Sequence, residues 1–382
     1  MKKRVRMMGV AKPGSILIEL LAVMAMMCPA MLVAQDKALT ADGGLKSVYG
    51  KLFAIGAAIP GADLKNEEIA LLSKHFTTVT PENCMKPEPI HPEEGRYDFT
   101  GGDALVKMAQ SKGLTVNGHT LVWHYQCPDW FFVDNGKPAG RELVLKRMRE
   151  HIAAVAGHYS GKVASWDVVN EAIDDGKGYL RNTKWTQCIG EDFIAEAFIA
   201  ARKADPKADL YYNDYSIEGG GKREKTLRLI RELKQRNVPI NGVGIQGHWQ
   251  VGRVPLKDIE AAIVAFHAEG MKVAITELDI DVVSRSASGA NVNAREKGAD
   301  DPFVDGLTPE MQKKLADDYT RLFELFLKHR DKISRVTFWG LHDGRSWLNS
   351  WPRKRTNHAL LFDRSLQPKP AAESVLELGR KQ

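Results

Sequence analysis

An amide and a carboxylate stand side by side at the end of an apolar run. Residues 163–169 are typical of a buried strand, and Asn170 and Glu171 follow them directly. A second glutamate, Glu277, lies near the end of another apolar run much further along the chain. Two carboxylates that face each other across a cleft can cleave a glycosidic bond, because one protonates the leaving oxygen while the other attacks the sugar or activates water. Alternatively, each glutamate pairs with a surface lysine, since most glutamates in proteins are exposed.

The residues around Glu277 favour the catalytic interpretation. Side chains of a strand alternate with a period of two, so Glu277 and Asp279 share one face. Gln246 and His248 share a face of the preceding strand in the same way. A histidine held by Asp279 could hydrogen-bond Glu277 and keep it ionised and oriented. Asn170 suits a hydrogen bond to a sugar hydroxyl beside the reacting carbon, a contact that can strengthen in the transition state.

Tryptophans follow the same predicted strands. Four of the eight in the chain lie at or just after strand ends, namely Trp123, Trp249, Trp339 and Trp347. A single tryptophan usually packs in a core, but an indole also offers a large rigid surface for the flat face of a sugar ring. Four of them near one mouth indicate a platform for sugars.

Other catalytic chemistries lack their patterns. His119 and His124 are five residues apart on one predicted strand and therefore point to opposite faces. The sequence contains no H-E-x-x-H or calcium-loop motif, and it has no G-x-S-x-G elbow for a serine nucleophile. No metal and no cofactor is therefore expected.

Eight apolar runs supply the strands that would position these residues: 53–59, 75–80, 114–123, 163–169, 209–214, 243–249, 272–279 and 335–341. Continuous apolar runs suit parallel strands that are covered on both faces. Helical patterns lie between them, at 141–159, 191–204, 222–237, 256–270, 309–329 and 370–382. The alternation predicts an α/β protein built as a single (β/α)8 TIM barrel. A doubly wound open sheet is the weaker alternative, because no glycine-rich phosphate loop follows the first strand.

The barrel adds a positional prediction. Its active site should lie where the carboxyl ends of the strands meet. Seven consecutive strand ends, from the second to the eighth, carry polar and aromatic residues. Glu171 and Glu277 should therefore meet at one mouth. Residues 284–306 are polar and rich in Gly, Ala and Asn, which indicates a loop inserted after the seventh strand.

The first 34 residues are typical of an export signal. A long apolar run that ends at Ala34 follows a basic cluster made of Lys2, Lys3, Arg4, Arg6 and Lys12. We expect cleavage after Ala34, a catalytic domain over residues 38–382, and a secreted or periplasmic protein with no stable membrane association. An uncleaved membrane anchor is one alternative, because about 20 apolar residues can span a bilayer. A pilin-like leader is a second, because GSILIELLAVM resembles the Gly-then-Glu pattern of prepilins.

Composition narrows the class of protein further. The hydrophobic content of 43% and the charged content of 27% are those of a globular protein. The net charge is +6, but beyond the leader both signs are interspersed, so nucleic acid is not an expected partner. Outside the leader, Cys84, Cys127 and Cys188 lack metal-like spacing, and buried free thiols are favoured over a Cys84–Cys127 disulfide. A monomer is expected.

Seven motifs carry a resemblance to a known family: TPENCMKPEPIHPEEGRYDF, GHTLVWHYQCPDW, WDVVNEAIDD, YYNDYSIE, GIQGHW, ITELDID and FWGLHDGRSWL. Together they resemble glycoside hydrolase family 10, the retaining endo-β-1,4-xylanases, over roughly residues 45–375. The resemblance implies that the chain cuts internal bonds of xylan and xylo-oligosaccharides. It implies that Glu171 is the acid/base and Glu277 the nucleophile, with carboxyl groups about 5.5 Å apart.

The resemblance also implies substrate-binding residues. Asn170, Gln246 and His248 would serve the sugar that is cleaved, and Trp339 and Trp347 would roof the cleft. The glycone side would be gripped by Glu82, Asn83, Lys86, His119, Trp123 and Gln126. The loop over residues 284–306 departs from the family in length, so the resemblance does not predict which residues bind the aglycone side.

Two other functions fit part of the pattern. Another retaining β-1,4-glycanase, such as a cellulase, can also carry Asn-Glu at the fourth strand of a barrel. A non-catalytic sugar-binding barrel is the second alternative, although the presence of Glu171, Glu277 and His248 speaks against it. Rates of hydrolysis of xylan and of carboxymethylcellulose distinguish a xylanase from a cellulase. A reducing-sugar assay distinguishes an enzyme from a non-catalytic sugar-binding protein.

Overall fold

The computed structural model describes residues 43–285, 290–298 and 301–382. Residues from Gly44 to Gln382 form one compact unit. The predicted export signal, residues 1–34, lies outside the described residues, and so does part of the predicted loop at 284–306. Within the described ranges, no helix is both long enough and apolar enough to cross a membrane.

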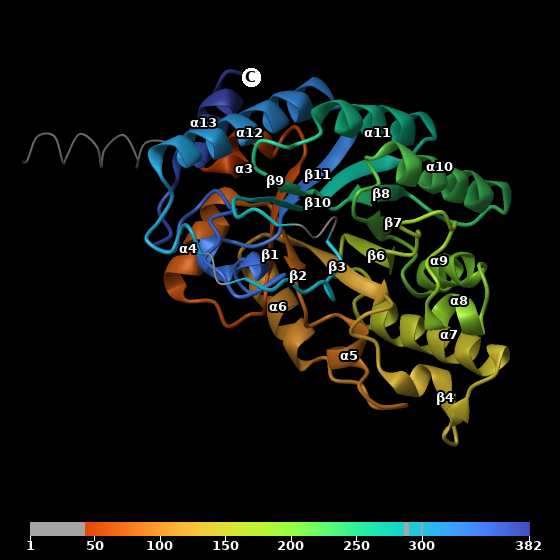
Figure 1. Ribbon diagram of the computed structural model, residues 1–382. Coiled ribbons are helices and arrows are strands. Elements are labelled where there is room, and N and C mark those ends of the chain that lie inside the picture. The colour runs from red at the N-terminus through yellow and green to blue at the C-terminus, as the bar shows by residue number, and fades with distance from the viewer. Residues whose placement is uncertain (1–42, 286–289, 299–300) are drawn as a thin grey trace, which may run out of the picture. The chain divides into compact units, whose positions relative to one another are not determined.

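Eight parallel strands of the described chain close into a barrel (Figure 1). The order around the barrel is β11-β1-β2-β3-β6-β7-β8-β10, and the pairing of β10 with β11 closes the ring. The predicted barrel is therefore confirmed, and the open sheet is excluded. The strands are β1 (Ala54–Ile59), β2 (Thr78–Pro81), β3 (Thr115–Val122), β6 (Ser165–Asn170), β7 (Asp209–Asp214), β8 (Gly242–Ile245), β10 (Lys272–Asp281) and β11 (Ile333–Phe338).

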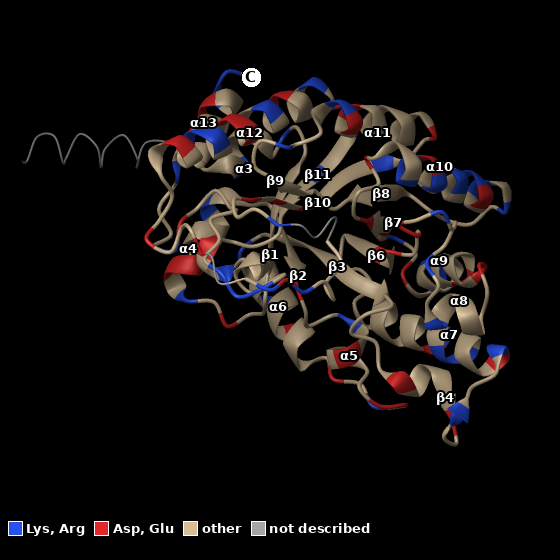
Figure 2. Ribbon diagram, viewed as in Figure 1, with Lys and Arg blue, Asp and Glu red and all other residues tan. Residues whose placement is uncertain are grey.

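Helices connect successive strands and cover the outside of the barrel (Figure 1). They are α4 (Asn66–His75), α5 (Pro87–Ile90), α6 (Thr100–Ser111), α7 (Arg141–His158), α8 (Lys184–Cys188), α9 (Phe193–Ala204), α10 (Gly220–Gln235), α11 (Leu256–Ala268), α12 (Pro309–Lys328) and α13 (Pro370–Arg380). Most strand residues are buried because the helices shield one face and the barrel interior shields the other. Figure 2 shows both signs of charge interspersed on the outer helices α7, α11 and α12.

Local sequence explains where the longer helices begin and end. Thr308 precedes α12 and accepts a hydrogen bond from the Met311 N–H at 3.2 Å, and Pro309 opens the first turn. Gly270 follows α11 with φ of +80°, a left-handed conformation that glycine adopts without steric cost. These signals match the helix ends that the sequence predicts.

The predicted strand over residues 243–249 is wrong in one respect. The run splits into β8 and a short strand β9 (His248–Gln250), which pairs with the outer end of β10. Gly247 lies between them with φ of +87°, so the chain turns inside an apolar run. The turn carries His248 out of the barrel wall and over the mouth. A short hairpin, β4 (Val133–Asp134) with β5 (Lys137–Pro138), was also not foreseen.

The two ends of the barrel unit lie against each other. A short helix, α3 (Leu45–Tyr49), precedes β1 and contacts α13, which is the last helix. The Tyr49 hydroxyl donates a hydrogen bond to the Val375 carbonyl at 2.6 Å. The first and last helices of the described chain, α3 and α13, are therefore in contact.

The three described cysteines are free. This confirms the prediction of free thiols over a Cys84–Cys127 disulfide. The side chains are half-buried, however, and not fully buried as expected.

Candidate active site

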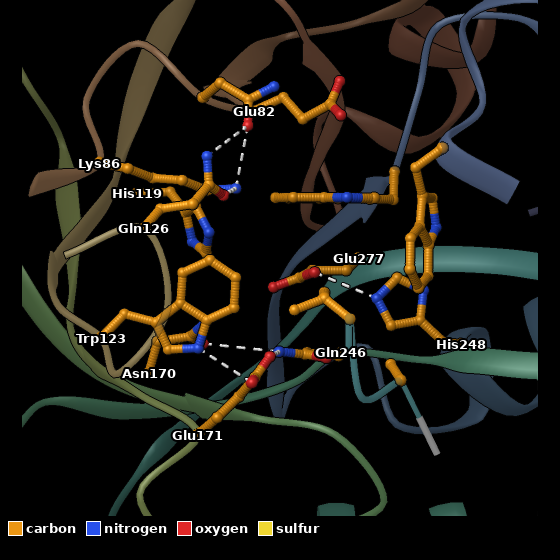
Figure 3. Close-up of a pocket in the computed structure, with 15 residues that line it drawn as sticks. Glu82, Lys86, His119, Trp123, Gln126, Asn170, Glu171, Gln246, His248 and Glu277 are labelled. Atoms are coloured by element: carbon orange, nitrogen blue, oxygen red, sulfur yellow. Dashed lines mark hydrogen bonds and ion pairs between the residues drawn. The ribbon is translucent and has the colours of Figure 1, made fainter. Parts of the chain in front are cut away.

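One cavity at the mouth of the barrel collects the predicted residues (Figure 3). The strand ends supply them, because parallel strands in a closed barrel present all their carboxyl ends at the same face. The lining comprises Glu82, Asn83, Lys86, His119, Trp123, Gln126, Asn170, Glu171, Gln246, His248, Glu277, Ala290, Val292, Trp339 and Trp347. Both predicted catalytic glutamates and every substrate-binding residue that the family resemblance implies are among them.

Glu171 follows β6 in a left-handed backbone conformation, with φ of +58°. Such a conformation is uncommon for a residue with a side chain and often marks a functional position. The Trp123 indole N–H donates to Glu171 Oε2 and the Gln246 amide donates to Oε1, each at 2.9 Å. Both donors are neutral, so the carboxyl group is held in place without a compensating positive charge.

Burial and the nearby charge of Asp214 raise the pKa of Glu171 to about 7, and the charge of Glu277 acts in the same direction. The two hydrogen bonds from Gln246 and Trp123 oppose this rise but do not cancel it. Glu171 can therefore carry a proton near neutral pH, which a general acid requires.

Glu277 lies on β10 and has the opposite character. The Asn213 amide donates to Glu277 Oε1 at 2.7 Å, and His248 Nε2 lies 3.1 Å from Oε2. Burial works against the charge of Glu277, but the hydrogen bond from His248 and the charge of His119 outweigh it and hold the pKa below its usual value. Glu277 is therefore the ionised member of the pair.

His248 is held between two carboxylates. Its Nδ1 lies 3.0 Å from Asp279 Oδ1, on the side opposite Glu277. Burial opposes protonation of His248, but Asp279 and Glu277 together raise its pKa to about 10. The Trp347 indole donates to the other oxygen of Asp279 at 2.8 Å, which fixes that carboxylate in turn. Glu277 therefore faces a cationic imidazolium whose orientation is set from behind.

A second polar group lies at the β2 and β3 side of the cavity. Lys86 donates to Gln126 Oε1 at 2.7 Å and to Asn83 Oδ1 at 3.1 Å, and its ammonium lies 4.9 Å from the Trp123 ring centre. Burial lowers the pKa of Lys86, although the charge of Glu82 opposes this. Burial also raises the pKa of Glu82. The group offers amide, ammonium and carboxyl atoms to sugar hydroxyls next to a flat indole.

His119 lies deeper, at the floor of the cavity. Its Nδ1 is 3.0 Å from Asp167 Oδ2, and its ring meets the Trp339 ring edge-on at 5.2 Å. Asp167 is itself inside the barrel and accepts a hydrogen bond from Asn117. The barrel interior therefore orients the residues on which a substrate would rest.

Two residues of β7 belong to the site and were not predicted. Asn213 lies against Asn170 at 2.9 Å and donates to Glu277, so it links the two catalytic strands. Asp214 raises the pKa of Glu171. The signal in the sequence is the polar Asn-Asp-Tyr run at the end of the predicted strand at 209–214, whose residue types alone indicate no particular role. Ala290 and Val292 of the predicted loop were also missed.

Trp249 does not join the cavity, unlike the other three tryptophans of the predicted platform. It adjoins His248 on β9 and therefore points to the opposite face, where its indole donates to Glu218 at 2.8 Å. Within the described residues, no cluster of three or more His, Cys, Asp or Glu side chains could hold a metal ion.

The geometry defines a class of protein. A closed (β/α)8 barrel whose mouth buries two glutamates, one with a raised and one with a lowered pKa, in a cavity lined by indole rings is suited to acid-assisted cleavage of a glycosidic bond. The chain belongs to glycosyl hydrolase family 10, whose sequence pattern matches residues 44–378.

Similar proteins carry xylanase names. An endo-1,4-beta-xylanase A of Xylanibacter ruminicola is 42% identical over 92% of this chain and 96% of its own length. An endo-1,4-beta-xylanase of Geobacillus stearothermophilus is 41% identical over 87% of this chain and 98% of its own. The solved structure of a GH10 endoxylanase from a sugarcane soil metagenome is 41% identical, with a TM-score of 0.85 over 88% of this chain and all of the other.

Proposed function

We propose that this chain is an endo-1,4-β-xylanase that cleaves internal bonds of xylan and xylo-oligosaccharides with retention of anomeric configuration. The observation that carries the proposal is the opposite protonation of two glutamates in one cavity. The pKa of Glu171 is about 7, whereas that of Glu277 lies below its usual value. A retaining glycosidase needs this asymmetry, because one carboxyl group must give a proton while the other attacks.

In the first step, Glu277 attacks the anomeric carbon and Glu171 protonates the departing glycosidic oxygen. The bond between the anomeric carbon and that oxygen breaks, and a glycosyl ester to Glu277 forms. The imidazolium of His248 lies 3.1 Å from Glu277 Oε2 and keeps the nucleophile ionised and oriented before attack.

In the second step, Glu171 takes a proton from water, and the water oxygen attacks the anomeric carbon. The ester to Glu277 breaks, and the sugar leaves with its original configuration. Esterification removes the charge of Glu277, which is one of the causes that raise the pKa of Glu171. The pKa of Glu171 therefore falls once the ester has formed, so Glu171 is ionised and able to accept a proton at the stage that needs a base.

The remaining residues would bind substrate. Gln246 is buried, and within the described chain its Oε1 has no hydrogen-bond partner, so this oxygen is available to a hydroxyl of the cleaved sugar. The polar group around Lys86 and Gln126 would bind the glycone side, and Trp339 and Trp347 would pack on sugar faces. A solved relative, 38% identical, is described as a mutant in complex with xylotriose.

We further propose export of the mature protein, on the basis of the leader over residues 1–34. A polymeric substrate such as xylan lies outside the cell, so hydrolysis of this polymer is consistent with a secreted or periplasmic enzyme. Mass spectrometry of the mature protein would test the cleavage after Ala34, and a mature chain that retains the leader would contradict it.

The activity is tested with purified mature protein on linear xylan and on carboxymethylcellulose. The expected result is release of short xylo-oligosaccharides, with little reducing sugar from the cellulose derivative. Preferential hydrolysis of the cellulose derivative would favour the cellulase-like alternative. Proton NMR of the earliest products should show the β-anomer, since two inversions at one carbon retain configuration. An initial α-anomer would contradict the proposed mechanism.

A further inference from the structure

A tight turn after β6 carries Glu171, and one downstream residue holds the carbonyl groups of that turn. Glu171 has φ of +58°, and the next two residues, Ala172 and Ile173, are buried. Arg181 Nε donates to the Glu171 carbonyl oxygen at 3.0 Å, and Arg181 Nη2 donates to that of Ile173 at 3.3 Å. The backbone N–H of Arg181 donates to the Ala172 carbonyl oxygen at 2.7 Å. A single residue therefore binds three consecutive carbonyl groups.

The N–H groups of the same turn are held by β7. Those of Ala172 and Ile173 both donate to the Tyr212 hydroxyl at 3.0 Å. A buried backbone group without a partner costs free energy, and a left-handed conformation persists only where its surroundings determine it. Tyr212 meets this requirement for the N–H groups, and Arg181 meets it for the carbonyl groups.

The connection after β6 folds back on itself, which explains how Arg181 reaches the turn. Ile173 and Leu180 form an antiparallel β-bridge. Between them, the Asp174 carboxylate accepts a hydrogen bond from the Gly176 N–H at 2.8 Å, as is common where aspartate closes a turn. The connection is therefore a short hairpin, and its returning arm brings the arginine to the backbone that leaves β6.

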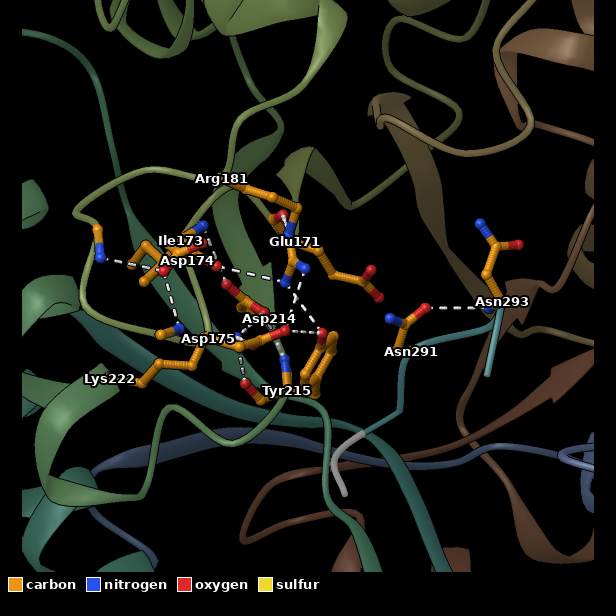
Figure 4. Close-up of polar contacts among 12 residues, drawn as sticks. Glu171, Ile173, Asp174, Asp175, Arg181, Asp214, Tyr215, Lys222, Asn291 and Asn293 are labelled. Carbon is orange, nitrogen blue, oxygen red and sulfur yellow. Dashed lines mark hydrogen bonds and ion pairs between the residues drawn. The ribbon is translucent and has the colours of Figure 1, made fainter. Parts of the chain in front are cut away.

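The Arg181 guanidinium is itself fixed from its other side. Nη1 lies 3.0 Å from Asp175 Oδ2, and Nη2 donates to the Tyr215 hydroxyl at 2.9 Å. That hydroxyl donates to the same Asp175 oxygen at 2.5 Å, and Lys222 donates to the other one at 2.9 Å. Figure 4 shows this cluster on one side of the turn, with the Glu171 carboxyl group extending away from Asp175 and Lys222.

We propose that Arg181 is a positioning residue for the acid/base, an inference that rests on the proposed xylanase function. The Glu171 carboxyl group takes hydrogen bonds from Trp123 and Gln246, whereas Arg181 holds the backbone from which it projects. A proton donor must meet the glycosidic oxygen at hydrogen-bond distance, and a misplacement of about 1 Å can cost about 10²-fold in rate. Release of the turn therefore weakens proton donation and leaves attack by Glu277 intact.

The experiment compares kcat/KM for linear xylohexaose with that for an aryl β-xylobioside whose leaving group is an acidic phenol. Only xylohexaose needs a proton in the first step. Arg181→Met should lower kcat/KM on xylohexaose by about 10- to 100-fold and change that on the aryl xylobioside by less than about threefold. Arg181→Lys should stay impaired on xylohexaose, because one ammonium group does not reproduce the planar fork that binds two carbonyl groups.

Arg147 of α7 provides a matched control. It also pairs with a carboxylate, that of Glu94, at 2.6 Å, and it donates to the carbonyl groups of Trp130 and Val133 at 2.8 and 2.9 Å. These four residues are not among those that line the active-site cavity. Arg147→Met should therefore lower the melting temperature and leave the ratio of the two kcat/KM values unchanged.

Tyr215→Phe tests the same cluster with a smaller change. It removes the hydroxyl that joins Arg181 to Asp175 and keeps the ring, so it also decides the question if Arg181→Met does not fold. The kcat/KM on xylohexaose should fall by about threefold, the order of one hydrogen bond, while that on the aryl xylobioside stays at the wild-type value.

The outcomes are distinguishable. Equal losses on the two substrates in the folded Arg181 and Tyr215 variants, or full activity of both on xylohexaose, would overturn the positioning role. Wild-type activity of Arg181→Lys on xylohexaose would overturn it too, because a positive charge alone would then suffice. Wild-type protein that cuts neither substrate would instead overturn the proposed function.

Discussion

Two buried glutamates in this barrel have the same exposure and opposite chemistry. Glu68 of α4 and Glu171 at the end of β6 are each 3% exposed. The Arg345 guanidinium holds Glu68 through two hydrogen bonds of 2.8 and 3.0 Å, and His342 lies 2.9 Å away. These partners lower the pKa of Glu68 to about 2, whereas burial and Asp214 raise that of Glu171 to about 7.

The difference shows that burial alone does not make a carboxyl group catalytic. A guanidinium fork stabilises the ionised form of Glu68 and ties α4 to the connection after β11. The Glu171 carboxyl group receives only neutral donors and faces two other acidic residues, so its proton is retained until a reaction removes it. One acid is fixed in a single state, and the other can alternate between two.

The largest expected effect belongs to the nucleophile. Glu277→Ala should lower kcat/KM on linear xylan by about 10⁵-fold or more, because it removes the carboxylate that forms the covalent intermediate. Circular dichroism should show an unchanged fold. An active Glu277→Ala protein would contradict the assignment.

Glu171→Ala should have a smaller effect that depends on the leaving group. On xylan, the loss of general acid catalysis should cost about 10²- to 10⁴-fold in kcat/KM. On an aryl β-xylobioside with an acidic phenol, the first step needs no proton, so kcat/KM should be largely spared. Equal losses on the two substrates would argue against the acid role.

Glu68→Gln should affect stability and leave catalysis intact. Loss of the charge opposite Arg345 should lower the free energy of unfolding by about 3 kcal/mol, measured by urea titration at pH 7. Because the folded pKa is depressed from 4.5 to about 2, the difference from wild type should be complete above pH 4.5 and should vanish as the pH falls toward 2. A kcat that falls by tenfold or more in the folded Glu68→Gln protein would contradict a purely structural role for Glu68.

The smallest predicted effect concerns pH dependence. In a plot of kcat/KM against pH, the decline on the alkaline side should lie near pH 7, where Glu171 loses its proton. Asp214→Asn should move this limb to lower pH, because it removes a charge that raises the pKa of Glu171. Asp175→Asn is the matched control, since Asp175 and Asp214 share the partner Lys222. Equal shifts in both variants would trace the effect to Lys222 instead.

The barrel was predictable because its strands are long apolar runs separated by helical stripes. The exceptions are local. The turn at Gly247 interrupts a run whose composition remains strand-like, so the split between β8 and β9 leaves no signal in hydrophobicity. The helices α3 and α8 span only one or two turns, too few residues for a helical periodicity to emerge.

The cavity residues were predictable for a topological reason. Once eight parallel strands close, residues at their carboxyl ends converge whatever their distance in sequence. The roles of Asp214 and of residues 290–293 were not predictable, because they depend on contacts between the connections that follow the strands. Ala290 and Val292 carry no chemical signal of their own, and only the bond between Asn291 and Tyr125 reveals their place over the mouth.

The contact between α3 and α13 has a practical consequence for handling the enzyme. The last helix of such a barrel ends at the face opposite the carboxyl ends of the strands, and α3, which leads into β1, lies at that face too. A solid support or a fused partner attached beyond α13 would therefore stand behind the barrel. An immobilised preparation would keep its mouth turned outward, toward a fibre too large to diffuse around it.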